Sequence, residues 1–423
     1  MLIMLGKRQL QREMRATGAS TSTEKGHVLS EEEMEEIWSD IQNIVTPTWM
    51  ASVPSNLGSP DHGKLKADQW RALGTIYFPI SLIRLWRMDQ IESARGQRCR
   101  KILGMTISLL SAVIIASSRT TSTANADAYF LHIQAYLNDI RHLFPEYKLR
   151  PNHHMALHLH EYLRLFGPVH AWWTFPFERI IGMLQRTPHN SKIGELEQTI
   201  AQSYTRSANL RALTSKSECP EAIKNCHSIF LKLVNPQVRD TLTTDINALT
   251  SLFDDVEELD DDSIAWNDLT TRVIFPEVHD ALSSFLGPDT VVPEVAQFLG
   301  YFKRDGLTYA TSYKHAGNSR VMLKSTKNTQ PVAARIEYVF QLRLATAVQT
   351  FVAFRRYRRA SISADPFLCF PVLQAQVLSD ELGTIEISEP AQIISHFAYL
   401  PTEMEGGKVL LAVPLSRVRS LEI

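Results

Sequence analysis

Three side chains between residues 154 and 161 have the types and spacing of a metal site on a helix. His154, His158 and Glu161 fall at positions i, i+4 and i+7, so one helix face would present two imidazoles and a carboxylate. Neither histidine is followed by Glu in the pattern of a zinc protease, and no fourth ligand is evident in the sequence. Histidines that pack or form hydrogen bonds are therefore favoured over a metal site.

Four arginines surround a tyrosine near the end of a strand-like segment, as Arg355, Arg356, Tyr357, Arg358 and Arg359. Cations beside an aromatic ring are typical of surfaces that contact DNA phosphates, and each charge contributes to a salt-dependent affinity. The alternative is a strand end whose charges prevent pairing with another chain. We predict DNA binding at these five residues and keep the alternative open.

Basic residues also gather in two other parts of the chain. One group lies in the first half and comprises Arg84, Arg87, Arg95, Arg98, Arg100 and Lys101. The other precedes the arginine cluster and comprises Lys303, Arg304, Lys314, Arg320, Lys324 and Lys327. An acidic run at residues 254–262 lies between them and is predicted to be a solvated linker. The formal net charge of −1 therefore averages regions of opposite sign and does not exclude DNA contact.

Helical periodicity dominates the first half of the chain. Ser30 is predicted to cap a helix, and Glu33 completes a capping box. Pro79 is expected to break or kink a second amphipathic stretch. Further helices are predicted at residues 97–117, 126–144, 155–166, 176–185 and 195–210. We predict a disordered tail at 1–29 and a helical domain at 30–235.

The second half has a different pattern. Residues 236–304 are predicted to form an acidic linker with short helices. Apolar and polar residues then alternate at 334–340, 350–355 and 408–413, which predicts strands. The fold class is therefore mixed α+β, with a large all-α helical domain followed by a small C-terminal β-barrel-like module at 305–423.

The composition limits the class of protein. The chain has 423 residues, with 44 Lys and Arg against 45 Asp and Glu, and 44% of it is hydrophobic. This balance excludes a dedicated nucleic-acid coat and a wholly disordered chain. Four cysteines are too few for a disulfide framework, which indicates an intracellular protein. The longest apolar stretch, 102–116, is shorter than the roughly 20 residues of a membrane span, so we predict a buried helix and no membrane partner.

Residues 151–200 carry the most specific motifs. They are Pro-Asn-His-His-Met-Ala-Leu-His from Pro151, Leu-Phe-Gly-Pro-Val from Leu165, and Trp-Trp-Thr-Phe-Pro-Phe-Glu-Arg from Trp172. Together with His-Gly-Lys from His62 and Cys-Pro-Glu-Ala-Ile from Cys219, this set resembles the downstream part of CACTA (En/Spm-like) transposon transposases of the fungal type. The specificity of the resemblance lies in the order and spacing of these short matches.

The resemblance implies an RNase H-like DDE/D parent enzyme. In such enzymes three carboxylates hold two Mg²⁺ ions, which activate water and stabilise the leaving oxygen. The Phe-Glu-Arg motif makes Glu178 the candidate third acid, and the alternative is an acid at the start of a helix capped by Thr174. The first two acids are expected on upstream strands, but residues 1–29 hold no Asp and no strand-like run. The chain is therefore expected to be catalytically incomplete and to hold no cofactor by itself.

These observations predict a nuclear C-terminal fragment of a transposase that retains a DNA-binding or interaction role. Its partners would be DNA and an upstream transposase domain or other transposase chains. Two alternatives stay open, namely a host-adopted protein-interaction module and a transposase subunit completed in trans by an upstream DDE/D fragment. Four aromatic residues bear on this choice because they suit either a platform for unpaired bases or, as we favour, a buried hub. They are Trp172, Trp173, Phe175 and Phe177.

Overall fold

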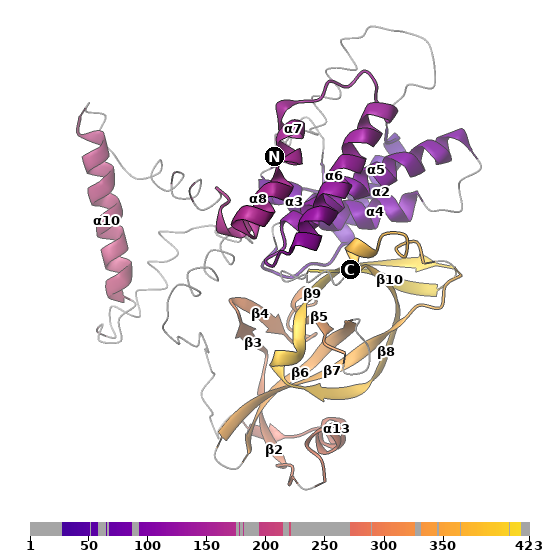
Figure 1. Ribbon diagram of the computed structural model, residues 1–423. Helices are drawn as coiled ribbons and strands as arrows, with labels where there is room; N and C mark the ends of the chain where they lie inside the picture. The colour runs from indigo at the N-terminus through magenta and orange to yellow at the C-terminus, as the bar shows by residue number, and fades with distance from the viewer. Residues whose placement is uncertain are drawn as a thin grey trace.

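The computed structural model shows one region of helices and one dominated by strands (Figure 1). The described residues are 28–50, 52–57, 65, 67–86, 93–174, 177, 181, 194–214, 220, 271–288, 290–325, 331–344, 347–363, 365–405 and 407–415. Residues 1–27 of the predicted tail and the acidic run at 254–262 lie outside them. The fold is mixed α+β, with helices first and a closed barrel of strands after them, which confirms the predicted fold class.

The first described helix, α2 (Glu31–Asn43), begins at the predicted capping box. The Ser30 hydroxyl accepts a hydrogen bond from the Glu33 N–H at 3.2 Å, and the Glu33 carboxylate accepts one from the Ser30 N–H at 2.8 Å. The same carboxylate accepts the indole N–H of Trp86 at 2.9 Å and pairs with Arg95 at 2.9 Å. Glu33 thus joins the start of α2 to two later helices.

A π-helical turn lies just before Pro79, where a break or a kink was predicted. Helix α3 (Ala67–Ala72), the π-helical η2 (Leu73–Tyr77) and α4 (Phe78–Leu85) follow one another directly. Proline lacks an N–H and crowds the preceding turn, and a wider turn on its N-terminal side relieves both effects. The chain therefore remains helical through this proline.

Two long helices, α5 (Ala94–Ala116) and α6 (Thr123–Leu143), pack against each other in the middle of the helical part. Each begins after a serine whose hydroxyl accepts a backbone N–H, Ser93 for α5 and Ser122 for α6. By length and composition α5 could cross a membrane, and 67% of its apolar window is buried inside the fold. Its apolar side chains contact the rest of the protein, as predicted for a buried helix.

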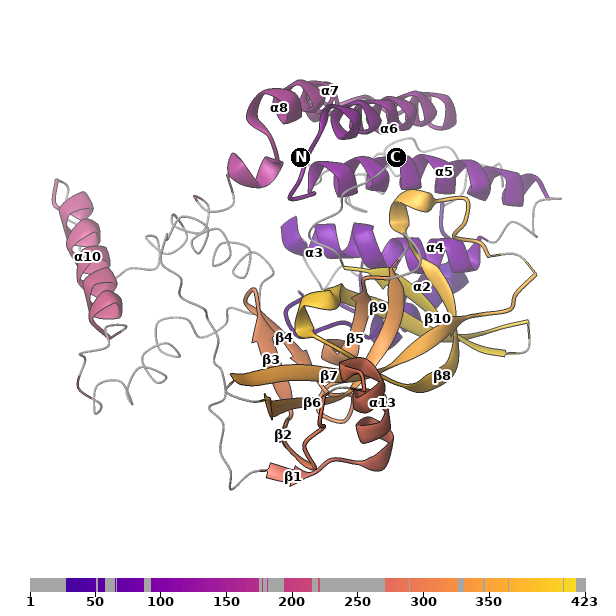
Figure 2. The same cartoon turned by 60° about the horizontal axis from the view of Figure 1, so that its bottom comes forward.

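The remaining helices are shorter or stand apart. Helices α7 (Pro151–Leu157) and α8 (Leu159–Phe166) meet at His158, which divides the single helix predicted there. A 3₁₀ turn, η4 (Val169–Ala171), follows. Helix α10 (Leu196–Thr214) lies away from the other helices in both views (Figures 1 and 2).

The strands form a closed six-stranded barrel. Their order around the barrel is β6, β5, β9, β10, β8 and β7, and β7 pairs with β6 to close the ring. All six pairings are antiparallel. The strands are β5 (Arg320–Leu323), β6 (Val332–Leu344), β7 (Ala347–Arg359), β8 (Gln376–Ser388), β9 (Ile393–Met404) and β10 (Gly407–Pro414).

Shorter elements surround the barrel, and several lie in the stretch predicted as a linker. They are β1 (Thr271–Val273), α13 (Pro276–Leu286), β2 (Val295–Leu299), β3 (Tyr301–Arg304), β4 (Leu307–Ala310), η6 (Gly317–Ser319), η7 (Pro371–Leu373) and η8 (Pro390–Gln392). Strand β2 pairs with β6, and β1 with β2, so the sheet begins before residue 305. These strands are too short to show a clear alternation in the sequence.

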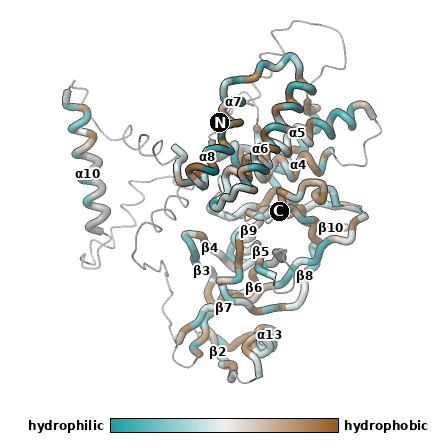
Figure 3. The backbone as a smooth tube through the Cα atoms, in the orientation of Figure 1, coloured by the Kyte–Doolittle hydropathy of each residue, from teal (hydrophilic) through white to brown (hydrophobic). Residues whose placement is uncertain are grey.

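The two faces of the barrel strands pack against different parts of the protein. Inward-facing side chains such as Met322 and Phe397 form the barrel interior. Outward-facing side chains of β8, β9 and β10 share one hydrophobic cluster with α2 to α8. Hydrophobic residues accordingly lie on both sides of this junction (Figure 3). Helix α13 closes one end of the barrel by packing Val278 and Leu282 against β6, β7 and β8.

The segment after α2 crosses from the helices to the barrel. Val45 forms a β-bridge with Tyr399 of β9, with N–H to oxygen distances of 2.9 and 3.2 Å. The Thr48 N–H donates to the side-chain oxygen of Asn318 at 2.9 Å. These contacts join residues separated by more than 250 positions in the sequence and fix the helical part against the barrel.

Candidate nucleic-acid interface

The start of α5 carries four cations within seven residues, Arg95, Arg98, Arg100 and Lys101. Arg95 pairs with Glu33, while the other three, which we call the α5 cations, are exposed and form no ion pair among the described residues. Since no described carboxylate pairs with them, the α5 cations form a basic surface suited to phosphate groups.

The second basic surface is the end of β7. Arg358 and Arg359 are exposed, and Arg356 pairs with Glu386 at 2.7 Å. Tyr357 is only 6% exposed because it points into the barrel, and burial raises the pKa of its hydroxyl to about 12. The structure thus corrects the prediction for Tyr357, whose ring cannot stack on a base. For Arg356, Arg358 and Arg359, DNA contact stays a prediction.

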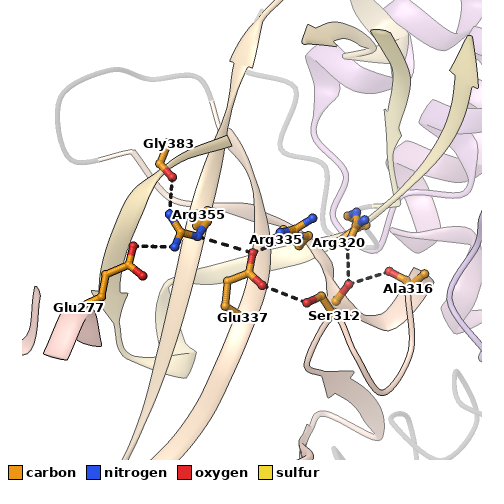
Figure 4. Close-up of polar contacts among 9 residues, drawn as sticks. Glu277, Ser312, Ala316, Arg320, Arg335, Glu337, Arg355 and Gly383 are labelled. Atoms are coloured by element: carbon orange, nitrogen blue, oxygen red, sulfur yellow. Dashed lines mark hydrogen bonds and ion pairs between the residues drawn. The ribbon is translucent and has the colours of Figure 1, made fainter. Parts of the chain in front are cut away.

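Arg355 also points into the barrel, in a row with Arg320 and Arg335 that we call the arginine row (Figure 4). The register places Arg320 opposite Arg335, and Arg335 opposite Arg355. Arg355 donates to Glu277 of α13 at 2.5 Å and to the Gly383 carbonyl at 3.0 Å. These contacts orient its guanidinium, whose side chain is still 27% exposed, so DNA contact by Arg355 stays a prediction.

A carboxylate lies at the centre of the arginine row. The register of β6 against β7 shifts between residues 336 and 338, and this bulge adds Glu337 beside the arginines. One Glu337 oxygen lies 2.6 Å from Nε of Arg335 and 4.0 Å from Nε of Arg355. The other accepts the Ser312 hydroxyl at 3.0 Å. Because like charges on neighbouring strands repel, Glu337 stabilises a row that would otherwise be unfavourable.

Aromatic rings and a hydroxyl complete the surroundings of Arg320. Its guanidinium carbon lies 5.8 Å from the ring centre of Tyr357 and 5.2 Å from that of Tyr399, and it donates to the Ser319 hydroxyl at 2.7 Å. Sequence reasoning missed this cluster. The alternation of Arg335 and Glu337 along a predicted strand was its only local signal, since the other contacts depend on strand register.

The three side chains with metal-site spacing do lie together. The Nε2 atoms of His154 and His158 are 3.3 Å apart, and Nδ1 of His158 lies 3.7 Å from Glu161. One imidazole can donate its N–H to the other, which satisfies the pair without a metal. Within the described part of the chain, no group of three or more His, Cys, Asp and Glu side chains is arranged to hold a metal ion.

Part of the aromatic group forms a local hub. Trp172 packs against Tyr162 and Phe166, with ring centres 6.0 and 6.3 Å apart. Phe177 is 65% exposed, and Phe175 lies outside the described residues. Trp172 is half-buried and one of its partners, Phe166, is 60% exposed, so the buried hub stays a prediction. Glu178, the candidate third acid, lies outside the described residues as well.

Comparison with known proteins identifies one family. Residues 117–225 match the family described as Domain of unknown function (DUF4218). This domain occurs in transposon-related proteins, and the match includes the histidines and Glu178. No curated protein and no solved structure matches the chain. The similarity thus connects this part of the helical region to transposon-related proteins and assigns no activity.

Proposed function

We propose that the chain is the C-terminal part of a CACTA (En/Spm-like) transposase of the fungal type, and that it acts in the nucleus as a DNA-binding protein without independent catalysis. Two features support this proposal. The DUF4218 match covers residues 117–225. The ordered motifs at 151–200, on which the resemblance rests, fall within that match.

The α5 cations are the observation that carries the DNA-binding part of the proposal. Arg98, Arg100 and Lys101 place three exposed charges within four residues of α5. Arg358 and Arg359 provide a second exposed pair at the end of β7. Each contact with a phosphate releases a condensed counterion, so affinity gained this way decreases as salt increases.

Replacing the three α5 cations by alanine is expected to weaken duplex binding and to reduce its dependence on salt. With a contribution of about 0.9 per phosphate contact, the slope of log affinity against log salt should become shallower by roughly 2.7. Fluorescence anisotropy of a labelled duplex, measured at several salt concentrations, gives this slope. Thermal unfolding of the variant checks that the fold is retained.

A matched control separates a local surface from net charge. The triple variant Arg141→Ala, Lys148→Ala and Arg272→Ala removes the same charge from exposed positions elsewhere. This control should leave the slope close to that of the wild type. An equal loss in both triple variants would show that overall charge, and not the start of α5, attracts DNA.

The protein is expected to show no magnesium-dependent DNA cleavage by itself. Strand cleavage in the parent enzymes needs three carboxylates that hold two metal ions. The described residues contain no such group, and Glu178 is the single acid that the family motif assigns. Supercoiled plasmid incubated with the protein and Mg²⁺ should stay supercoiled. Nicking that Glu178→Gln abolishes would overturn this part of the proposal.

One observation favours an interaction role as the second candidate. Apolar side chains are exposed on α6, α7 and α8, where Leu131 is 66%, Met155 49%, Leu165 72% and Phe166 60% exposed. Such side chains suit a protein partner, either a host protein or an upstream DDE/D fragment that completes a transposase in trans. A partner retained after nuclease treatment, together with no duplex binding at low salt, would favour this candidate.

A further inference from the structure

A serine lies two residues beyond the basic end of β7. Arg358 and Arg359 stand three and two residues before Ser361, and the apolar Ile362 follows it. Two adjacent arginines, one further residue and then Ser occur at this one place in the 423 residues. Basophilic Ser/Thr protein kinases select this charge pattern, with acidic pockets for the guanidinium groups and an apolar pocket for the residue after the serine.

The structure presents this motif at the surface. Arg358, Arg359 and Ser361 are exposed, and Ser361 lies two residues beyond the end of β7 in irregular backbone. The register of β7 against β8 shifts twice just before it, so this strand end is held less regularly than the rest of the strand. The Ser361 hydroxyl has no hydrogen bond to any described residue. It is therefore free to react.

Ser363, two residues further along the chain, is held by hydrogen bonds. The backbone N–H of Ser363 donates to Glu405 at 3.0 Å, and its hydroxyl donates to the same carboxylate at 2.5 Å. On the other side, the Ala360 N–H donates to the Val377 carbonyl at 2.9 Å. Ser361 therefore lies between two fixed points, with Ile362 half-buried against the helical core. Binding of the motif in a kinase cleft therefore requires a local opening that releases the Ala360 N–H from Val377 and lifts Ile362 from the core.

We propose that Ser361 is a phosphorylation site for a basophilic Ser/Thr kinase, and that its phosphate weakens the contact of Arg358 and Arg359 with DNA. The second statement rests on the proposed function. In the transfer, the Ser361 hydroxyl oxygen attacks the γ-phosphorus of Mg²⁺-bound ATP. The bond from this phosphorus to the β–γ bridging oxygen breaks, ADP leaves, and the hydroxyl proton passes to the catalytic base of the kinase.

The phosphate changes the charge of this surface. It adds about −1.5 to −2 charges two residues from Arg359. An internal phosphate then competes with the phosphates of DNA for the two arginines.

The first test measures phosphate transfer to the full chain. A kinase that prefers Arg at these two positions is incubated with ATP, Mg²⁺ and the wild type, Ser361→Ala, Ser363→Ala or the double variant Arg358→Ala, Arg359→Ala. We expect modification of Ser361, mapped by mass spectrometry, in the wild type and in Ser363→Ala. In the double variant the rate of phosphate transfer to Ser361 should decrease by roughly tenfold. A synthetic peptide of residues 355–365 that reacts while the full chain stays unmodified at Ser361 would overturn the site.

The second test measures duplex binding at low salt. Phosphorylated wild type should bind the duplex roughly fivefold more weakly than the unmodified protein. The affinity of Ser361→Ala should be unchanged by treatment with the kinase. If the arginine double variant loses affinity and the phosphorylated protein does not, the regulatory statement is wrong. If unmodified protein does not bind DNA at all, the proposed function fails, and the mass measurement still decides the site.

Discussion

Replacing Gly317 by alanine is expected to destabilise the protein by about 3 kcal/mol, because a Cβ at this position has no room. It would lie 2.0 Å from the carbonyl oxygen of Thr46, 2.5 Å from the carbonyl carbon and 2.9 Å from the nitrogen of Pro47. These are backbone atoms, which cannot rotate away as a side chain can. The segment that crosses from α2 to the barrel must therefore move away from η6.

This displacement disrupts the contacts that hold the segment in place. Next to the close approach, the Thr48 N–H donates to the side-chain oxygen of Asn318. One residue further, the Trp49 indole N–H donates to Nδ1 of His396, which is fully buried. Both contacts need the backbones of η6 and of this segment to be close. The cost of the substitution therefore includes the junction between the helices and the barrel.

Urea unfolding measures the effect of Gly317→Ala, and Gly104→Ala is its control. Gly104 lies inside α5, and no atom comes within 4 Å of a Cβ built there. In the control, alanine should stabilise the helix by about 0.5–1 kcal/mol, because glycine is a poor helix former. Equal unfolding midpoints for Gly317→Ala and the wild type would contradict the close approach between η6 and the crossing segment.

Features that depend on neighbouring residues could be predicted from the sequence. The capping box of Ser30 and Glu33 is a four-residue pattern, and the structure confirms it. The spacing of His154 and His158 correctly placed their imidazoles on one face. The break between α7 and α8 had no such signal, since no proline or glycine marks it. Likewise, the π-helical turn before Pro79 is one of several ways to accommodate a proline, and the sequence does not choose among them.

Features that depend on register could not be predicted. In the cluster from Arg355 to Arg359, the sequence shows four cations and a ring without alternation. The pairing of β7 with β6 and β8 decides that Arg355 and Tyr357 point inward, while Arg356 points outward. The partner of Arg355, Glu277, is 78 residues away and comes from a helix inside the predicted linker. A basic cluster on a strand therefore has to be divided by face before it can be interpreted as a DNA surface.

Replacing Glu337 by glutamine is expected to destabilise the protein by about 2 kcal/mol. The substitution keeps the shape of the side chain and removes the anion beside Arg335 and Arg355. Removing one partner of a fully buried ion pair costs about 3–5 kcal/mol. Here Glu337 is 13% exposed and the two arginines are 29% and 27% exposed, so water screens part of the loss. The free energy of unfolding in urea measures the effect.

The ion pair of Arg356 and Glu386 provides the matched control for this prediction. It also joins an arginine of β7 to a glutamate, but its side chains are 44% and 39% exposed. Glu386→Gln should therefore cost at most about 0.5 kcal/mol, as is usual for surface pairs. If the free energy of unfolding decreases by the same small amount in both variants, solvent rather than Glu337 offsets the repulsion within the arginine row. If Glu337→Gln alone lowers the free energy of unfolding, the bulge in β6 is what allows three arginines to share the barrel interior. Of the β7 arginines, the exposed ones are then Arg356, Arg358 and Arg359.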